Sequence, residues 1–246
     1  MLLLEAKQLK KYYGDRLILE VPDLKVYGHD RIGVVGPNGA GKTTLLDLLC
    51  GRLAPDDGSV AVYGSLTYLS QLEPPKEKRL DPEMASRFSV PAVWHDQMSG
   101  GEKTRFKLAQ IMGGLNCHMI LADEPTSSLD IGGIELLEEM LESFAGALMV
   151  VSHDRDFLDR LCSKILEVEA GRITIYPGNY SEYARLKAEH QARAEFEYQQ
   201  YVKEKQRLEE VASRLKQQSA GIKRTPKRMG ISEARLHKMG GQNAKA

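Results

Sequence analysis

The pattern of apolar and polar positions predicts an α/β fold followed by one long polar helix. Three short apolar runs are interpreted as buried strands, and they are Arg31–Val35, Cys117–Ala122 and Ala147–Val151. Continuous runs of this kind are typical of parallel strands that are covered on both faces. Apolar residues recur at helical spacing in Thr43–Cys50, Thr104–Leu115 and Ile134–Phe144. The alternation predicts a parallel core sheet with helices on its faces.

Shorter alternating runs, bounded by turn residues, predict six further strands. They are Leu2–Leu9, Arg16–Val26, Ser59–Tyr63, Leu66–Ser70, Ile165–Val168 and Arg172–Tyr176. The first two are expected to pair antiparallel across a turn at Lys10–Asp15. The last two are expected to pair across Ala170-Gly171 and to close the sheet.

The segment between Gln71 and Ser99 has a different character. Its 27 residues, Leu72–Met98, contain four prolines, and proline removes helix donors, so any helix in this insert is predicted to be short. The sequence Ser99-Gly100-Gly101-Glu102-Lys103 follows the insert and opens the helix predicted from Thr104.

A long helix is predicted after the α/β region. From Tyr180 to about Gln218 the chain has no glycine or proline and is rich in good helix formers. Its apolar residues are too sparse for a buried helix, so it needs a partner helix. We expect a turn at Gly221–Gly230 and the start of a returning helix at Ile231–Met239. The predicted domains are residues 1–178 and a helical linker over residues 179–246.

Charge is distributed unevenly along this chain, whose formal net charge is zero. Its last 33 residues carry nine basic side chains and one acidic side chain, a net charge of +8. A basic tail on an acidic domain suggests contact with phosphate, and a solvated charged turn is the alternative.

Cysteine usage and hydropathy predict a cytoplasmic protein. Cys50, Cys117 and Cys162 are widely spaced within apolar runs, which argues against a disulfide framework or a metal site. We interpret them as small buried hydrophobic residues. Because no apolar run approaches the roughly 18 residues of a membrane span, no membrane partner is expected.

The strand at Arg31–Val35 runs into a glycine-rich loop. Residues Gly36-Pro37-Asn38-Gly39-Ala40-Gly41-Lys42-Thr43-Thr44 fit the phosphate-binding pattern G-x-x-x-x-G-K-[ST]. A strand, a glycine turn and a helix N-terminus direct backbone N–H groups and the helix dipole at one anion. Lys42 is predicted to contact the β- and γ-phosphates of a nucleotide, and the Thr43 hydroxyl to bind Mg²⁺.

Two acidic residues close the apolar strand Cys117–Ala122. The Asp123 carboxylate can hold Mg²⁺ directly or through water, and Glu124 is placed to polarise an attacking water. A structural role is hard to assign, because buried charges need a partner. Gln71 and His153 also follow predicted strands, where Gln71 could reach metal or water and His153 the γ-phosphate. A surface glutamine and a helix-capping histidine are the alternatives.

Together these segments resemble the ATP-binding-cassette ATPases. The matching positions follow the family's order, and they are the phosphate loop, Gln71, Ser99–Lys103, Asp123-Glu124, Ser128-Leu129-Asp130 and His153. The resemblance covers Leu2–Tyr176 and implies hydrolysis of ATP with Mg²⁺ as cofactor. It also implies a nucleotide-binding domain with an antiparallel β subdomain and a reduced helical insert, followed by a long α-helical extension.

The resemblance implies further nucleotide contacts. One of Tyr12 and Tyr13 should stack on adenine, and Tyr13 is favoured because the family places the aromatic residue before this glycine turn; a surface tyrosine is the alternative. In this family, Ser99–Glu102 contact the γ-phosphate held by a different domain. This chain, with one phosphate loop, is expected to need a second cassette, in cis if it is a fragment or by homodimerisation. Alone it should hydrolyse ATP weakly.

The insert and the long helix indicate a branch of the family. Transporter ATPases carry a larger helical subdomain at the insert, so a transporter subunit is the alternative function. The long helix and basic turn resemble the F group, translation factors whose helical hairpin enters the ribosomal exit-tRNA site. That resemblance implies rRNA and tRNA as partners of the linker. Pro177–Tyr183 and His153–Leu158 resemble the group's linker junction and switch segment.

One position departs from the F group. Most members have Asn-His where this chain has Ser127-Ser128. The small-residue version, with the reduced insert, resembles members that protect ribosomes from antibiotics. We therefore expect ribosome protection or a role as a translation factor.

Overall fold

The computed structural model describes residues 1–69, 77–113, 117–127 and 129–222. The chain forms two compact units, Met1–Leu186 and Lys187–Ala246, and each is described by itself. The predicted domain boundary after residue 178 stays a prediction. Gln71, Ser128, the returning helix and most of the basic turn lie outside the described residues.

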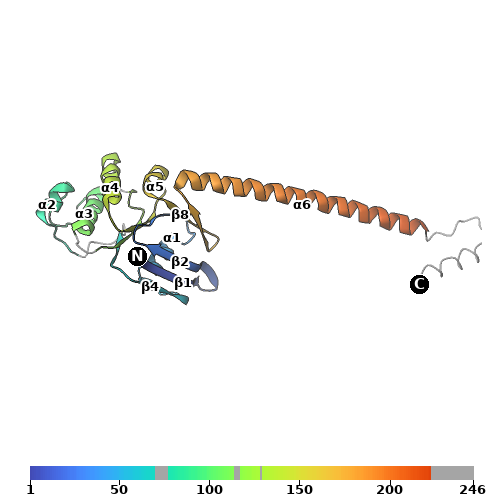
Figure 1. Ribbon diagram of the computed structural model, residues 1–246, viewed down its shortest axis with the longest axis horizontal. Coiled ribbons are helices and arrows are strands. Elements are labelled where there is room, and N and C mark those ends of the chain that lie inside the picture. The colour runs from blue at the N-terminus through green and yellow to red at the C-terminus, as the bar shows by residue number, and fades with distance from the viewer. Residues whose placement is uncertain (70–76, 114–116, 128, 223–246) are drawn as a thin grey trace, which may run out of the picture. The chain divides into compact units, whose positions relative to one another are not determined.

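The described strands form one nine-stranded mixed sheet (Figure 1). In chain order they are β1 (Leu2–Tyr13), β2 (Arg16–Tyr27), β3 (Arg31–Val35), β4 (Asp57–Val62), β5 (Leu66–Leu69), β6 (Met119–Asp123), β7 (Ala147–Val151), β8 (Lys164–Glu169) and β9 (Arg172–Pro177). Their order across the sheet is β4-β1-β2-β9-β8-β3-β7-β6-β5. The predicted α/β fold with an antiparallel subdomain is confirmed.

The parallel half of the sheet holds the three most apolar strands. β3 pairs with β7 and β8, and β6 pairs with β7 and β5, all in parallel. Every residue of β7 is buried, as predicted for a strand covered on both faces. Val34 and Asp123 both pair with Val151, so β3, β6 and β7 end side by side. Residues that follow these strands therefore gather at one edge of the sheet, where ligands bind in α/β folds.

The antiparallel half begins with a hairpin that is longer than predicted. The turn expected at Lys10–Asp15 is wrong, because β1 continues through Tyr13, which pairs with Arg16 on β2. The turn contains two residues, Gly14 and Asp15, and Gly14 has a φ of 58°. A two-residue hairpin needs positive φ values that glycine adopts without strain. The two tyrosines therefore belong to a strand.

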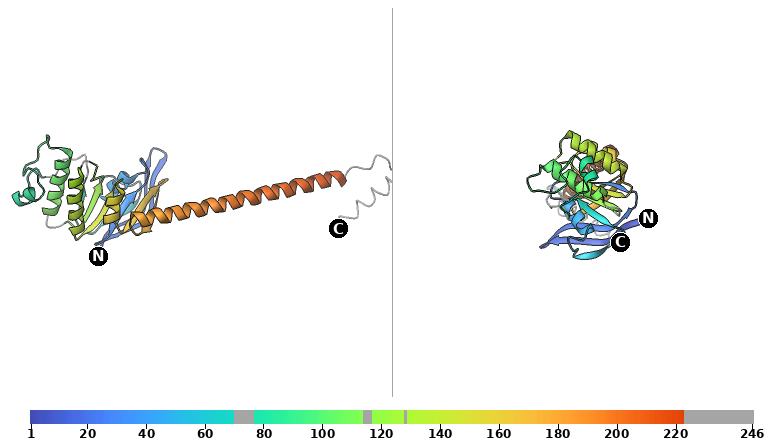
Figure 2. Two further views of the ribbon diagram at one scale, coloured as in Figure 1. Left: turned by 90° about the horizontal axis from the view of Figure 1, so that it is seen from above. Right: turned by 90° about the vertical axis from the view of Figure 1, so that its left-hand side faces the viewer.

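Helices cover both faces of the sheet. They are α1 (Lys42–Leu49), α2 (Pro82–Arg87), α3 (Gly100–Gly113), α4 (Ile131–Ser143), α5 (Arg155–Leu161) and α6 (Tyr180–Ile222). Ile120 and Ala122 of β6 share one core with α3, α4 and α5, whereas Met119 and Leu121 share the other core with α1, β1 and β2. Successive side chains of a strand point to opposite faces, so β6 serves both cores. Figure 2 shows α2, α3 and α4 on the side away from β1 and β2.

Several helix boundaries differ from the expected ones. The helix predicted from Thr104 begins at Gly100, and α5 follows β7 without having been predicted as a separate element. Within the described part of the insert, α2 has six residues and an Asp81 cap, which agrees with the expectation of short helices. Gly221 belongs to α6, so the predicted turn cannot begin there.

Cysteine burial is also less uniform than expected. All three cysteines are free, but Cys162 alone is fully buried, and Cys50 and Cys117 are half-buried. Cys162 therefore fits the interpretation as a buried hydrophobic residue, and the other two fit it in part.

The first turn of α6 belongs to the first unit and is held there by hydrogen bonds. The Tyr183 hydroxyl donates to Glu167 Oε1 of β8 at 2.6 Å, and the Ser181 N–H donates to Asp159 Oδ1 of α5 at 2.7 Å. In the second unit, most of the described apolar side chains of α6 are exposed, in agreement with their sparse spacing, and they include Phe196, Tyr201 and Leu208; Val202 is half-buried.

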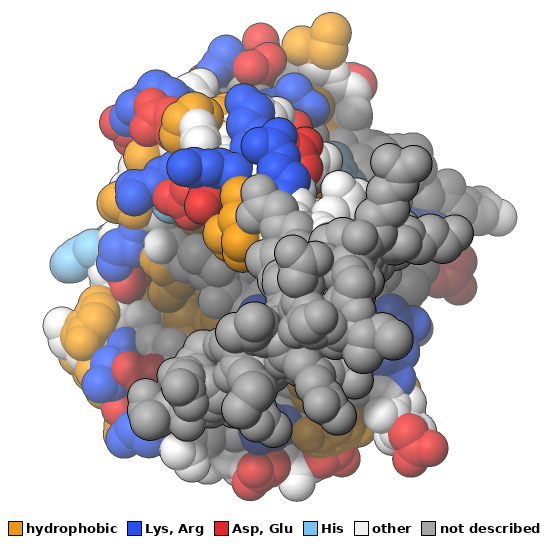
Figure 3. All heavy atoms as spheres, turned by 90° about the vertical axis from the view of Figure 1, so that its right-hand side faces the viewer, with side chains coloured by type: hydrophobic (Ala, Val, Ile, Leu, Met, Phe, Trp, Pro, Cys, Tyr) orange, Lys and Arg blue, Asp and Glu red, His pale blue; other side chains and the backbone are white. Residues whose placement is uncertain are grey.

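Two surface properties bear on possible partners. None of the described helices combines the length and the apolar character that crossing a bilayer requires. On the face seen in Figure 3, the described Lys and Arg side chains are interspersed with Asp and Glu side chains.

Candidate functional site

The glycine-rich loop connects β3 to α1 and depends on glycine at three positions. Gly36, Gly39 and Gly41 have φ values of 149°, 76° and 104°, a region that favours glycine. A Cβ atom at Gly36 would lie 2.2 Å from the carbonyl oxygen of Val168 on β8, so no side chain fits there. Asn38 and Gly39 form the exposed tip, and Ala40 is half-buried.

The amino end of α1 has no side-chain cap. Gly41 occupies the N-cap position without a side-chain hydrogen bond, and the first turn contains no acidic residue. Backbone N–H groups in the first turn of a helix lack intrahelical partners, so they can bind an anion. Lys42 Nζ donates to the carbonyl oxygens of Gly36 at 2.9 Å and Pro37 at 3.2 Å, which places the ammonium group at the loop. Thr44 is half-buried beside it.

Thr43 and Asp123 meet at this edge of the sheet. The Thr43 hydroxyl donates to Asp123 Oδ2 at 2.8 Å. Hydroxyl and carboxylate oxygens suit Mg²⁺, which usually takes one or two protein ligands together with phosphates and water. The described residues contain no cluster of three or more His, Cys, Asp or Glu suited to a metal. The pair therefore fits a Mg²⁺ ion whose other ligands come from a nucleotide and water.

Glu124 lies next to His153 in an unusual backbone conformation. Its φ is 49°, and its N–H donates to the carbonyl oxygen of Val151 at 2.9 Å. Glu124 Oε1 lies 3.4 Å from His153 Nε2, and Oε2 accepts from the His153 N–H at 3.4 Å. Although Nε2 is within ion-pair range, Oε1 is buried and accepts no hydrogen bond from the described residues. Burial raises the pKa of Glu124, and His153 partly opposes this. A carboxylate with a raised pKa and an available acceptor suits a general base.

Ser99 and Glu102 cap the amino end of α3. The Ser99 N–H and hydroxyl both donate to Glu102 Oε2 at 2.8 Å, and the Glu102 N–H donates back to Ser99 Oγ at 3.2 Å. These bonds from Ser99 lower the pKa of Glu102. Among the described residues, no hydrogen bond or ion pair joins Ser99–Glu102, which include Gly100 and Gly101, to the glycine-rich loop. The two predicted phosphate contacts are therefore not linked within one chain.

Tyr13 and Gln71 are the two remaining residues that were predicted to belong to the site. Tyr13 is 56% exposed and Tyr12 is 39% exposed, so both remain candidates for stacking on a base. Gln71 lies outside the described residues. The preceding strand in the sequence, β5, ends with Leu69 paired to Ala122, so β5 leads toward the edge where Asp123 lies.

Tyr68 and Arg52, which lie beside Asp123, were not predicted as site residues. The Tyr68 hydroxyl donates to Asp123 Oδ2 at 3.4 Å, and the Arg52 guanidinium lies 4.4 Å from the centre of the Tyr68 ring. Arg52 Nη1 is 3.7 Å from Asp47 Oδ1. Burial raises the pKa values of Tyr68 and Asp47. The contact depends on the pairing of β5 with β6, in which Tyr68 pairs with Leu121 and so shares a face with Asp123, and no local pattern in the sequence indicates this register.

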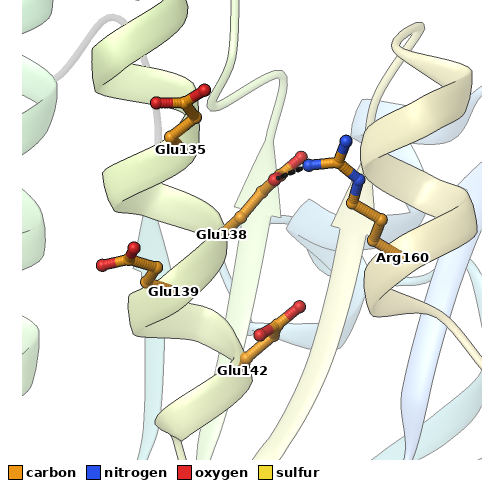
Figure 4. Close-up of a pocket in the computed structure, with 5 residues that line it drawn as sticks. All are labelled: Glu135, Glu138, Glu139, Glu142 and Arg160. Atoms are coloured by element: carbon orange, nitrogen blue, oxygen red, sulfur yellow. Dashed lines mark hydrogen bonds and ion pairs between the residues drawn. The ribbon is translucent and has the colours of Figure 1, made fainter.

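An acidic hollow between α4 and α5 is separate from these residues. Figure 4 shows its lining, which is Glu135, Glu138, Glu139, Glu142 and Arg160. Arg160 donates to Glu138 at 2.6 Å, and this bond ties α5 to α4. The hollow gathers negative charge, so it does not suit phosphate.

Two segments of the chain match protein families described as ABC transporter, residues 19–85 and residues 166–243. The chain is 34% identical to the erythromycin resistance ATP-binding protein MsrA of Staphylococcus epidermidis, over 73% of this chain and 38% of that protein. It is 32% identical to the energy-dependent translational throttle protein EttA of Escherichia coli, over 75% and 38%. It is 33% identical to the ATP-binding protein Uup of Caulobacter vibrioides, over 72% and 34%. The matched part of the chain thus spans 34–38% of these relatives.

Solved structures agree on the fold. An inward-facing metal-chelate type ABC transporter matches with a TM-score of 0.61 and 21% identity, over 72% of this chain and 84% of that one. The ATP-binding subunit of an ABC transporter matches with a TM-score of 0.61 and 18% identity, over 71% and 90%. At these identities the matches establish the architecture alone. The phosphate loop, the two family matches and the curated relatives show that the chain belongs to the ATP-binding-cassette ATPases, and within that family it resembles the F group.

Proposed function

We propose that this chain is the ATP-binding and ATP-hydrolysing cassette of a ribosome-associated F-group protein. The observation that carries the proposal is the convergence at one sheet edge. The loop after β3, the acids at the end of β6 and His153, which follows β7 by two residues, come together there. This places a lysine, a hydroxyl, two carboxylates and an imidazole around the uncapped end of α1.

The proposed roles follow from the contacts of each side chain. Lys42 and the N–H groups of α1 hold the β- and γ-phosphates, and Thr43 and Asp123 hold Mg²⁺, which stabilises charge on the phosphates. Glu124 accepts a proton from the attacking water, and His153 orients Glu124 and contacts the γ-phosphate. The proposed role of Gln71 at metal or water rests on its place after β5. Tyr13 is the proposed platform for adenine.

A second cassette is part of the proposal. Ser99, Gly100, Gly101 and Glu102 would contact a γ-phosphate held by another domain, whether in cis or in a homodimer. In the single chain, Ser99 and Glu102 bond to each other. Because the isolated chain lacks the second cassette, it would bind ATP weakly and turn it over slowly.

The proposed link to the ribosome rests on the named relatives and on the tail. One relative is named for erythromycin resistance and another for throttling translation. The basic residues after Arg214 would contact rRNA and tRNA near the exit site, with affinity that falls steeply as salt rises. A transporter subunit is the second candidate, and the 27-residue insert offers little to receive a membrane partner.

Co-sedimentation with ribosomes tests the proposal. In ATP, Glu124→Gln should prolong ribosome association, because hydrolysis would no longer reset the cassette. Glu139→Gln, the same change at an exposed position of α4, is the matched control and should behave as the wild type. Equal sedimentation of the wild type and Glu124→Gln would contradict ATP-gated ribosome binding. Copurification with a membrane protein would favour the transporter instead.

A further inference from the structure

The Tyr68 side chain occupies a defined position between β5 and the proposed metal ligand. Tyr68 pairs in register with Leu121, and Asp123 lies two residues further along β6 on the same face. Its hydroxyl therefore reaches Asp123 Oδ2, at 3.4 Å. The same oxygen accepts the Thr43 hydroxyl at 2.8 Å, so hydroxyls from two separate elements hold one carboxylate oxygen.

The Tyr68 ring is itself held in place by α1. Arg52, just beyond the end of α1, lies over the ring at 4.4 Å, within range of a cation–π contact. The Arg52 N–H also donates to the carbonyl oxygen of Asp47 at 2.9 Å, which fixes the backbone at this point. Residues at both ends of α1 therefore help to position Asp123. Thr43 in the first turn donates a hydrogen bond to it directly. Arg52, which follows the helix, contacts the ring of Tyr68, and the Tyr68 hydroxyl donates to Asp123.

These two hydrogen bonds fix the orientation of the Asp123 carboxylate, because both are made to the same oxygen. Both described hydrogen bonds to Asp123 end on Oδ2, and none of the described residues donates to Oδ1. Groups that hydrogen-bond a metal-ligating carboxylate fix its orientation, and their loss typically weakens metal binding. Oδ1 is therefore the oxygen left to face a cation or its water.

We propose that Tyr68 is a positioning residue for Mg²⁺ binding, acting through the Asp123 carboxylate, with Arg52 holding its ring. The proposal rests on the proposed function, because it assigns Asp123 to the metal of a bound nucleotide. It predicts that the Tyr68 hydroxyl contributes to the effect of Mg²⁺ on nucleotide affinity and not to nucleotide affinity without metal.

The test is Tyr68→Phe in the full chain, which removes the hydroxyl and keeps the ring under Arg52. Affinity for a non-hydrolysable ATP analogue is measured in excess Mg²⁺ and in excess EDTA. The ratio of the two affinities should fall roughly 10-fold in Tyr68→Phe, while the EDTA value stays within about 2-fold. Tyr63→Phe is the matched control, because Tyr63 is an exposed tyrosine just beyond β4. It should leave both values unchanged.

The outcomes separate the two proposals. If the ratio of the affinities in Mg²⁺ and in EDTA is the same in Tyr68→Phe as in the wild type, the positioning role is overturned and the proposed function is not affected. Equal loss of affinity with and without Mg²⁺ also overturns it, because that result indicates damage to the fold. A wild-type chain whose affinity does not respond to Mg²⁺ overturns the proposed function and this inference together.

Discussion

The two helix ends proposed to contact γ-phosphates, those of α1 and α3, carry similar sequences but differ in their hydrogen bonds. Lys42-Thr43 opens α1, and Lys103-Thr104 lies in the first turns of α3. The α1 end has a glycine cap without a side-chain bond, whereas Ser99 and Glu102 close the α3 end. The two threonines differ as well. Thr43 donates to Asp123, and Thr104 donates to the carbonyl oxygen of Gly100.

The pKa values of the glutamates near the two helix ends are shifted in opposite directions. Burial raises the pKa of Glu124, and hydrogen bonds from Ser99 lower the pKa of Glu102. We therefore expect that a lysine and a threonine at the start of a helix do not by themselves make a site for the chain's own nucleotide. An uncapped end and a nearby carboxylate pair distinguish α1. At the α3 end, Ser99 and Glu102 already bond to each other, so a ligand that contacts these two residues must replace their bonds.

The largest expected effect is at Lys42. Lys42→Ala should lower the affinity for ATP about 100-fold, because hydrogen bonds from a charged group to phosphate each contribute about 1.5–3 kcal/mol. Lys103→Ala is the matched control at α3 and should change affinity less than about 2-fold in the isolated chain. Titration with a fluorescent ATP analogue measures both. Comparable losses in the two variants would mean that α3 contacts the nucleotide of its own chain.

The next effect concerns the metal. Thr43→Ala should reduce the enhancement of nucleotide affinity by Mg²⁺ about 10- to 100-fold, because a proposed ligand is lost. Affinity in EDTA should change little. Thr104→Ala removes a hydrogen bond to helix backbone and should leave the Mg²⁺ effect intact. If the Mg²⁺ effect survived in Thr43→Ala, the assignment of the Thr43 and Asp123 pair to the metal would be wrong.

The features that could be predicted from the sequence are those that depend on residues close together in the chain. The phosphate loop, the buried strands and the long helix were found because glycine spacing and apolar runs are local signals. The hairpin was shortened in the prediction, because Tyr12 and Tyr13 looked like turn residues beside Gly14. Their pairing with β2 decides their structure, and pairing is not a local signal.

The candidate site also combines features that local sequence signals predict with features that depend on strand pairing. The residues that follow β3, β6 and β7 were each predicted to contact nucleotide, metal or water, and they meet because these parallel strands end at one edge. The contact between Tyr68 and Asp123 joins residues 55 positions apart and depends on the register of β5 against β6. That register cannot be derived from either strand alone. The Ser99 and Glu102 cap was visible as S-x-x-E, but the phosphate role implied by the resemblance was assigned to both residues instead.

A smaller effect is expected from removing the α3 cap. Ser99→Ala should destabilise the chain by about 1 kcal/mol, which lowers Tm by about 2–4 °C, because the helix loses its side-chain cap. ATP affinity of the isolated chain should not change. Ser127→Ala is the control, since Ser127 is an exposed serine whose hydroxyl donates to the carbonyl oxygen of Glu124 without capping a helix. A drop in ATP affinity in Ser99→Ala alone would place α3 at the chain's own nucleotide.

The smallest effects are expected in the pH dependence of stability, and they have opposite signs. The lowered pKa of Glu102 means that its charged form stabilises the fold above the unfolded-state pKa, and this contribution is lost as the pH falls through the folded pKa. Glu102→Gln should therefore lower Tm at pH 7, and the difference should shrink below about pH 4. The raised pKa of Glu124 means that ionisation costs stability as the pH rises through its folded pKa.

Glu124→Gln should accordingly raise Tm at pH 7, and this gain should also vanish below about pH 4. Thermal melts of both variants and the wild type in metal-free buffer at two pH values measure the signs. Opposite signs at neutral pH would support the difference between a helix end capped by side chains and the proposed catalytic edge with its poorly solvated carboxylate. The same sign for both glutamates would contradict it, because the two groups would then share one electrostatic environment.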